Sequence, residues 1–356
     1  MRAVLLERHG GPEVLTLTTV PDPAPPPGWV AVRVRACALN HLDLWARRGL
    51  PGVRFPLPLI LGNDVAGVVR EVGAGVDWVK PGDEVVLAPG FGCGHCAACL
   101  AGDDNLCRRY AILGSAVNGG YAERVVAPAA NCLPRPARLS WPEAASLPLV
   151  FLTAWHMLAA RAELAPHEDV LLHAAGSGVT TAGIQIARLL GARRILVTSS
   201  SAEKLDRARA LGATHLIDVT TTDFARAARE ATGGRGVDVV FDHLGGETFE
   251  RSLKCLAWGG RLVTCGATAG ASAGLPLRAV FFKSLSILGS TMGSNAELAR
   301  LLPWFETGAL RPVVARTFPL EEAPAAQELL AARGVFGKIV LTVGGGGAEV
   351  PRPKGD

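Results

Sequence analysis

The sequence predicts an α/β protein that combines a β-rich domain with a doubly wound parallel sheet. In residues 1–125, short apolar runs are separated by Pro- and Gly-rich breaks, a pattern typical of short strands joined by turns. From residue 169 onward, short apolar runs alternate with segments of helix length. Strands that alternate with helices imply right-handed crossovers and therefore a parallel sheet.

Composition excludes several classes of protein. The chain has 356 residues, a length that favours two domains, and its 49% apolar and 19% charged residues are ordinary for a globular protein. The net charge is +4 and the basic residues are scattered. Because nucleic-acid and membrane surfaces bind concentrated basic faces, we expect neither as a partner. We find neither a membrane-spanning apolar run nor a secretory signal, and therefore expect a cytoplasmic location.

The first part of the chain contains three segments that we expect to be strands, at 30–35, 66–72 and 79–86. The first alternates apolar and charged residues, which is the pattern of a half-buried strand. Near residue 140 the pattern changes to a helix start. Ser140 is a capping residue, Pro142 falls in the first turn and Glu143 follows the cap by three residues.

The second part contains the apolar runs of the parallel sheet. We expect strands at 169–173, 194–198, 237–241 and 260–264. Helices are expected at 181–190 and 203–211, and Gly212 is the favoured residue after a helix end.

Four cysteines lie close together in the sequence with the spacing C-x2-C-x2-C-x7-C: Cys93, Cys96, Cys99 and Cys107. Four thiolates can surround Zn²⁺ tetrahedrally and leave no open position, so this pattern predicts a structural zinc site. An iron–sulfur cluster is the alternative, since it uses similar spacing. Cys37, Cys132, Cys255 and Cys265 are isolated, and we expect them to be small buried side chains.

A small-residue loop links the strand predicted at 169–173 to the helix predicted at 181–190. Small residues allow the backbone to approach a pyrophosphate, whose charge is met by the amides of the following helix. The candidate cofactor residues are Gly176, Ser177, Gly178 and Val179. The loop departs from G-x-G-x-x-G, so a tight turn without a ligand is the alternative.

The segment after the next strand bears on which dinucleotide is bound. An NAD site usually places Asp or Glu there to bind the ribose hydroxyls, whereas this chain has serines followed by a lysine. We therefore favour NADP(H) over NAD(H). Ser199 and Ser200 are candidate cofactor residues that offer hydrogen bonds without a negative charge. The candidate for the 2′-phosphate is Lys204, with Arg193 or Arg194 as a further cation. The alternative is that Ser200 or Ser201 simply caps the next helix.

Taken in order, these motifs resemble the medium-chain dehydrogenase/reductase superfamily, over essentially the whole chain to about residue 343. The matching segments are 38–43, 61–67, 81–85, the four cysteines, 120–123, 152–155, the glycine loop and 337–341. The resemblance implies a GroES-like catalytic domain (1–150 and 292–343), a Rossmann NAD(P)-binding domain (151–291) and a flexible tail (344–356). It also implies a small-molecule substrate bound between the two domains, and a homodimer or homotetramer.

Zinc alcohol dehydrogenases of this superfamily hold a second, catalytic zinc through Cys, the His of a Gly-His-Glu motif, and a third residue. Here these positions hold Asn40, Gly62-Asn63-Asp64 and, near the third, Leu149. Neither an amide nor a leucine replaces thiolate and imidazole, and Asp64 alone would not hold the metal. We therefore expect no catalytic zinc. In this respect the chain is similar to the quinone and enone reductases, although it keeps the structural zinc motif.

Without a metal to polarise a carbonyl, hydride transfer to a conjugated acceptor is the less demanding reaction. We place the amides of Asn40 and Asn63 at the substrate oxygen, where oriented donors can stabilise developing charge; the alternative is that they tie loops together. The predicted reaction is NADPH-dependent reduction of a quinone or an α,β-unsaturated carbonyl. The alternatives are a zinc-independent alcohol dehydrogenase or carbonyl reductase, and a non-catalytic NADP(H)-binding protein.

The resemblance also implies roles for residues around the cleft. His41 is expected to reach the cofactor phosphates, with proton donation as an alternative, and Asp43 to support the cleft through hydrogen bonds. Trp45 is a candidate for the substrate pocket or the core, and His156 is expected to be a packing residue. Thr153, His243, Leu244, Cys265 and Gly266 match positions that contact the nicotinamide half of the cofactor.

Overall fold

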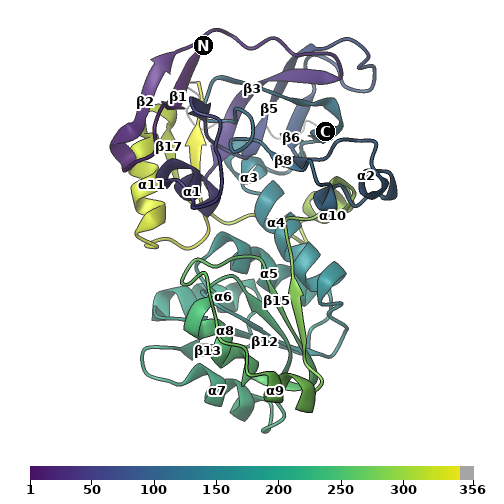
Figure 1. Ribbon diagram of the computed structural model, residues 1–356, viewed down its shortest axis with the longest axis vertical. Helices are drawn as coiled ribbons and strands as arrows, with labels where there is room; N and C mark the ends of the chain where they lie inside the picture. The colour runs from purple at the N-terminus through teal and green to yellow at the C-terminus, as the bar shows by residue number, and fades with distance from the viewer. Residues whose placement is uncertain (345–356) are drawn as a thin grey trace, which may run out of the picture.

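The computed structural model describes residues 1–344, which form a β-rich part and a second part built on a parallel sheet (Figure 1). The β-rich part is the upper half of the view and combines both ends of the chain, whereas the teal and green middle of the chain forms the lower half. Apart from Gly344, the predicted flexible tail lies outside the described residues.

The β-rich part contains a three-stranded antiparallel sheet and a seven-stranded sheet. The first has the order β2 (Leu15–Thr19), β1 (Arg2–Leu6), β4 (Leu59–Ile60). The second has the order β10 (Cys132–Pro134), β6 (Glu84–Leu87), β5 (Asp64–Val72), β3 (Trp29–Ala38), β18 (Lys338–Thr342), β17 (Val314–Pro319), and β9 (Arg124–Pro128) pairs with β3. A short pair, β7 (Gly90–Phe91) and β8 (Ala111–Ile112), flanks the cysteine segment.

Strand β3 is the centre of this sheet and joins the two ends of the chain. It pairs with β5 on one side and with β18 on the other, with Cys37 opposite Leu341. The predicted strand at 30–35 is confirmed and runs on to Ala38. The strand predicted at 79–86 begins only at Glu84, because Lys80 and Asp83 close a turn in which the Asp83 N–H donates to the Lys80 carbonyl at 3.1 Å.

The second part contains six parallel strands and confirms the doubly wound sheet. Their order is β13 (His215–Asp218), β12 (Arg194–Ser199), β11 (Asp169–Leu172), β14 (Val237–Asp242), β15 (Leu256–Thr264), β16 (Ser286–Gly289). The strand order reverses at β11, so the crevice at the carboxyl end of β11 is where such sheets bind ligands. The chain returns to the β-rich part after β16.

Helices cover both faces of the parallel sheet: α5 (Gly178–Leu189), α6 (Ala202–Leu211), α7 (Phe224–Ala231), α8 (Gly246–Leu253) and α9 (Leu277–Phe282). Helix α5 begins three residues before the predicted start because Ser177 caps it, accepting the Thr180 N–H at 3.1 Å. Ser201 caps α6 in the same way, and Gly212 follows its last residue as predicted.

The remaining helices lie on the β-rich part and at the junction. They are α1 (His41–Arg48), α2 (Ala97–Ala101), α3 (Trp141–Ala145), α4 (Pro148–Trp155), α10 (Asn295–Thr307) and α11 (Ala323–Ala331), with short helices at Pro12–Val14, Asp104–Leu106, Ala129–Asn131, His156–Arg161 and Leu320–Glu322. The predicted capping box at Ser140 and Glu143 is present. Within residues 1–344, no helix combines the length and hydrophobicity needed to cross a bilayer.

Helix α4 joins the two parts. It packs against α5, and Phe151 meets Phe305 of α10 edge to face, with ring centres 4.9 Å apart. Because α4 contacts both parts, the boundaries at 150 and 292 remain a proposed division of the chain.

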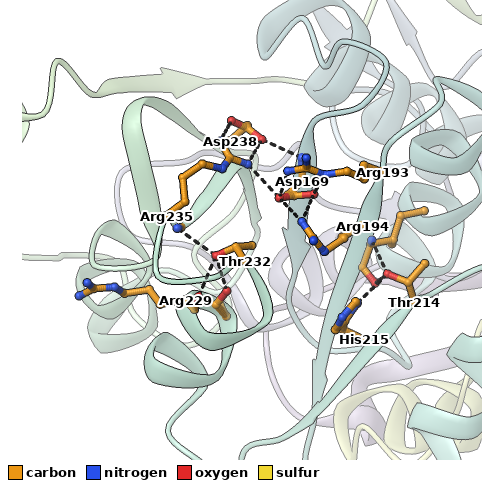
Figure 2. Close-up of polar contacts among 12 residues, drawn as sticks. Asp169, Arg193, Arg194, Thr214, His215, Arg229, Thr232, Arg235 and Asp238 are labelled. Atoms are coloured by element: carbon orange, nitrogen blue, oxygen red, sulfur yellow. Dashed lines mark hydrogen bonds and ion pairs between the residues drawn. The ribbon is translucent and has the colours of Figure 1, made fainter.

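An ion-pair cluster lies at the amino edge of the parallel sheet (Figure 2). The buried Asp169 carboxylate accepts from Arg193 at 2.7 Å, Arg194 at 3.1 Å and Arg235 at 2.8 Å, and Arg235 also pairs with Asp238 at 2.6 Å. The expectation that Arg193 or Arg194 meets a 2′-phosphate is therefore corrected. Parallel strands place all their amino ends on one edge, opposite the edge that carries the glycine loop.

Candidate active site and cysteine lobe

A cavity of about 660 Å³ lies between the β-rich part and the carboxyl edge of the parallel sheet. Most of the predicted site residues line it, from both parts of the chain. They are Asn40, His41, Trp45, Thr153, Gly176, Ser177, Gly178, Val179, Ser199, Ser200, Lys204, His243, Leu244, Cys265 and Gly266. Asn63 and Asp64 are fully buried and lie behind this lining.

The glycine loop packs closely against the segment that precedes β18. A Cβ added at Gly176 would lie 2.7 Å from the Val335 carbonyl oxygen, and one added at Gly178 would lie 2.8 Å from Lys338 Cδ. The Gly337 N–H also donates to the Gly176 carbonyl at 2.9 Å. The missing side chains therefore allow this loop to lie close to the β-rich part as well as to face the cavity.

The end of β12 presents serines and a lysine to the cavity. Ser201 is the residue that caps α6, which leaves Ser200 exposed at the cavity. Lys204 Nζ donates to the Arg333 carbonyl at 2.6 Å. Among the described residues that line the cavity the cations are Lys204, Arg251, Arg333 and Lys338, and no Asp or Glu is present.

Three histidines line the cavity without carrying charge at neutral pH. Burial lowers the pKa values of His41, His173 and His243 to about 4. His173 lies between two hydroxyl groups, with Thr198 Oγ1 3.0 Å from Nδ1 and Ser252 Oγ 2.8 Å from Nε2. A neutral imidazole is a weak acid, which argues against His41 as the proton donor.

A buried hydrogen-bond network lies where the family's catalytic zinc would be expected. Asn40 Nδ2 donates to Asn63 Oδ1 at 3.0 Å and to Asp64 Oδ2 at 2.9 Å. Lys338 Nζ donates to Asn40 Oδ1, to Asp64 Oδ2 at 3.0 Å and to the Leu39 carbonyl at 2.7 Å. All three ammonium hydrogens and both Asn40 amide hydrogens are therefore engaged within the chain.

Sequence reasoning missed Lys338. The available signal was a lysine inside the closing apolar segment 337–341, a residue type that is rarely buried unless it is paired. Its partner Asp64 lies 274 residues away along the chain, so the pairing depends on β18 lying beside β3.

Asn63 and Asp64 also fix neighbouring loops. Asn63 Nδ2 donates to the Leu113 carbonyl at 3.2 Å, and Asp64 Oδ1 accepts the Leu149 N–H at 2.8 Å. These bonds agree with the alternative that the asparagines tie loops together. Donation from Asn40 to a substrate oxygen would require it to exchange one of its present bonds.

Asp43 binds the backbone of two segments around Asn40 through its carboxylate. Its carboxylate accepts the backbone N–H groups of Asn40 at 2.7 Å and Gly62 at 3.1 Å, in agreement with its expected supporting role. Burial raises the pKa of Asp43 to about 7. Thr153 faces the cavity, and its buried hydroxyl has no hydrogen-bond partner among the described residues.

The four cysteines form a cluster in the segment 92–110, which we call the cysteine lobe. The sulfur atoms of Cys93, Cys96, Cys99 and Cys107 lie within 4.8 Å of one another. The Cys107 sulfur accepts the N–H groups of Cys93 at 3.4 Å and Arg109 at 3.3 Å. Four soft sulfur donors at this spacing fit a tetrahedral Zn²⁺ and leave no position for a substrate.

The other four cysteines are free thiols. Cys37 and Cys255 are buried as expected, whereas Cys132 and Cys265 are only partly so. Burial raises the pKa of Cys265 to about 12, so its thiol stays protonated beside the cavity.

Comparison with known proteins agrees with this architecture. Residues 26–137 match the alcohol dehydrogenase GroES-like domain, and residues 178–307 match the zinc-binding dehydrogenase family. The chain is 32% identical to a 2-haloacrylate reductase from a Burkholderia species, over 95% of this chain and 98% of that protein. The chain belongs to the medium-chain dehydrogenase/reductase superfamily. As a member it combines a GroES-like domain with a Rossmann-like parallel sheet, and it is an NAD(P)-dependent oxidoreductase.

Other superfamily relatives carry different activities in their names. A quinone oxidoreductase from Rattus norvegicus is 31% identical over 96% of this chain and 97% of its own length. A crystal structure of an NAD-dependent alcohol dehydrogenase is 50% identical, with a TM-score of 0.92 over 97% of this chain and 100% of that one. The chain spans only 14% of the spectinabilin polyketide synthase system protein NorB of Streptomyces orinoci, to which it is 39% identical.

Proposed function

We propose that this protein uses NADPH to reduce quinones or α,β-unsaturated carbonyls and that it does so without a catalytic zinc. The observation that carries the proposal is the network of Asn40, Asp64 and Lys338. The three positions that hold zinc ligands in the zinc alcohol dehydrogenases are Asn40, Asn63 and Leu149 here. Asp64, the carboxylate next to them, is already neutralised by the ammonium of Lys338. An apolar side chain and amides do not make a zinc site.

The predicted reaction follows from what the cavity offers in place of a metal. A nicotinamide held beside Thr153 would supply a hydride, and a conjugated acceptor would spread the resulting charge over an enolate or a hydroquinone anion. The Thr153 hydroxyl has no partner among the described residues and is available to a nicotinamide. Asn40 also lines the cavity, and its amide would donate to the acceptor by exchanging one of its present bonds. The proton then comes from water or from a cleft residue other than the neutral His41.

The lining around this end of the cavity supports an apolar acceptor. The apolar residues of the cavity lining include Leu39, Leu42, Trp45, Ile112, Leu149 and Met292. Transfer of an aromatic or cyclic ring from water to such a surface lowers the free energy of the system. Two of the relatives reported above, the haloacrylate reductase and the quinone oxidoreductase, are named for acceptors with conjugated double bonds.

Charge favours NADP(H) as the cofactor. Apart from Lys338, which is paired with Asp64, three cations (Lys204, Arg251 and Arg333) and no carboxylates among the described residues line the cavity. Ser200 is exposed at the position where an NAD site usually has an acidic residue. NAD(H) remains the alternative, because the similar alcohol dehydrogenase structure is named for NAD.

The cysteine lobe is proposed to hold one structural Zn²⁺ per chain. Metal analysis of purified protein tests this and the lost catalytic site together: one zinc per chain is expected, and iron with acid-labile sulfide would indicate a cluster instead. Two zinc ions per chain would contradict the argument from Asn40 and Asn63.

A substrate panel tests the reaction class. Purified protein is assayed with NADPH against quinones, enones and saturated aldehydes, and with NADP⁺ against alcohols, and each arm is repeated with NADH or NAD⁺. Reduction of quinones or enones is expected. Alcohol turnover without such reduction would support the alcohol dehydrogenase alternative, which the 50% identical structure favours. Cofactor binding with no turnover of any compound would support a non-catalytic role.

A further inference from the structure

The chain runs along the cavity when it returns from the parallel sheet to α10, and we assign this part of the lining to the proposed substrate end. Residues 290–294 make this crossing, and Thr291 and Met292 line the cavity. Met292 is held at a φ of 52°, in the left-handed region that a side chain disfavours. A Cβ added at Gly293 would lie 2.6 Å from Leu152 Cδ1, so the backbone runs directly against α4. Surrounding contacts must hold the crossing in this shape.

Two of these contacts come from the cysteine lobe. Asn105 Nδ2 donates to the Thr291 carbonyl at 3.1 Å, and the Asn295 N–H donates to Asp104 Oδ1 at 2.9 Å. The two bonds hold the crossing on both sides of Met292. In Figure 1 the lobe's helix α2 lies on the same side of the molecule as α10.

A second group of side chains extends this connection to α4 and α10. The buried Asn105 amide lies 3.5 Å from His156 Nε2, and His156 Nδ1 lies 3.0 Å from the Glu297 carboxylate. Glu297 in turn accepts the Ser294 N–H at 2.7 Å, at the end of the crossing. Asn105 therefore contacts both the crossing and His156 beside it, and Asp104 adds a separate bond to the first residue of α10.

The lobe has little apolar packing to hold Asn105 in place. Helix α2 contributes no buried residue, and Leu100 and Leu106 are exposed. The turn that carries Asn105 ends where the Cys107 N–H donates to the Asp104 carbonyl at 3.0 Å, so the fourth cysteine of the cluster fixes one end of the turn. The position of Asn105 thus depends on the sulfur cluster, which a bound metal would hold together.

We propose that the cysteine lobe sets the substrate wall of the cavity, with Asn105 as the positioning residue that transmits its position to Thr291 and Met292. The inference rests on the proposed structural zinc and on the proposed substrate end. It gives the lobe a role in acceptor binding although it lies outside the cavity lining. The cofactor end, formed by the glycine loop and β12, is not part of this connection.

Hydrogen exchange of the full-length protein tests the structural step without any substrate. Three proteins are compared with zinc bound: the wild type, Asn105→Ala, and Leu106→Gln as a matched control in the same turn. The wild type is also measured after zinc removal by a chelator. Amides of 290–297 should exchange about tenfold faster in Asn105→Ala and in the zinc-depleted wild type. Those of β11 should not change, and Leu106→Gln should match the wild type.

Kinetics of the zinc-bound variants tests the functional step. With an acceptor that the wild type reduces, Asn105→Ala should raise the KM for that acceptor about five- to tenfold. A change of this size corresponds to the free energy of roughly one hydrogen bond. The kcat of Asn105→Ala should stay within about twofold of the wild-type value. Its Kd for NADPH, which fluorescence titration measures, should also stay within about twofold. A lobe that only stabilises the fold would not separate KM from Kd in this way.

The outcomes separate this inference from the proposed function. Unchanged exchange at 290–297 after zinc removal and in Asn105→Ala would overturn the inference, whatever the protein reduces. Faster exchange with an unchanged KM for the acceptor would also overturn it. If no quinone or enone is reduced, the proposed function fails, and the exchange result alone decides whether the lobe positions the crossing. If Asn105→Ala does not fold, the zinc-depleted wild type still decides.

Discussion

At the scale of single residues, the pairing of Lys338 with Asp64 is the feature on which the site depends most. Both side chains are buried, and the ammonium is the only cation bonded to this carboxylate among the described residues. Lys338→Met should lower the free energy of unfolding by about 3–5 kcal/mol, because it leaves a buried charge unpaired. Urea unfolding measures this, and Lys338→Met with Asp64→Asn should recover much of the loss. A single variant as stable as wild type would show that the pair does not matter.

The buried histidines make stability depend on pH. The pKa of His173 is lowered to about 4 by burial, so the unfolded chain binds more protons between about pH 4 and 6.5. The stability that His173 contributes is present above about pH 6.5 and is lost as the pH falls through about 4. The raised pKa of Asp43 acts in the opposite direction, since its contribution is lost as the pH rises from about 4 to 7.

Comparison with His173→Asn isolates the histidine, because Asp43 is common to both proteins. Between pH 7 and 4 the wild type should lose about 1–3 kcal/mol more unfolding free energy than the variant. Chemical denaturation at a series of pH values gives this difference. Parallel pH profiles for the two proteins would contradict the account.

At the scale of elements, the start of α6 is proposed to select the dinucleotide. Lys204→Met should lower kcat/KM with NADPH about 10- to 100-fold, since an ammonium–phosphate contact is worth roughly 1.5–3 kcal/mol. The value with NADH should change little. Lys254→Met, an exposed lysine at the end of α8, is the matched control. An equal loss with both cofactors would indicate that Lys204 acts through its bond to the Arg333 carbonyl.

Local patterns predicted most elements because their signals lie within a few residues. The strands at 30–35 and 194–198 and the helix at 203–211 were found within a few residues of their observed ends, and the Ser140 cap was found directly. The pairing of β18 with β3 and the bond between Asn105 and Thr291 were not, because they join segments far apart in sequence. The prediction for Arg193 and Arg194 was wrong because charge alone does not tell whether a residue lies at the amino or the carboxyl ends of the strands.

At the scale of the whole molecule, strand β16 is the outermost strand on one side of the parallel sheet. Strand β16 pairs only with β15 among the described strands, and Trp258, Phe281 and Phe282 are exposed beside it. Trp258 and Phe282 lie 6.0 Å apart between ring centres. An edge strand can pair antiparallel with its own copy about a two-fold axis, so we propose this edge as the homodimer interface.

Light scattering tests that proposal. The wild type should have the mass of a dimer or of a tetramer made from such dimers, and Trp258→Ser with Phe281→Ser should halve it. Aromatic residues that are hot spots of an interface contribute about 2 kcal/mol or more each. Leu275→Ser, a nearby exposed residue outside the aromatic group, is the control. A mass unchanged by the double substitution would place the interface elsewhere.

The proposed function requires the cavity to direct hydride to a conjugated acceptor without a catalytic metal. Reduction of 2-cyclohexenone with NADPH deuterated at both C4 positions tests it most directly, with the label located by NMR of the product. The expected product is cyclohexanone carrying deuterium on the carbon β to the carbonyl. Cyclohexenol with deuterium on the former carbonyl carbon would contradict it, because that product requires reduction of the carbonyl itself.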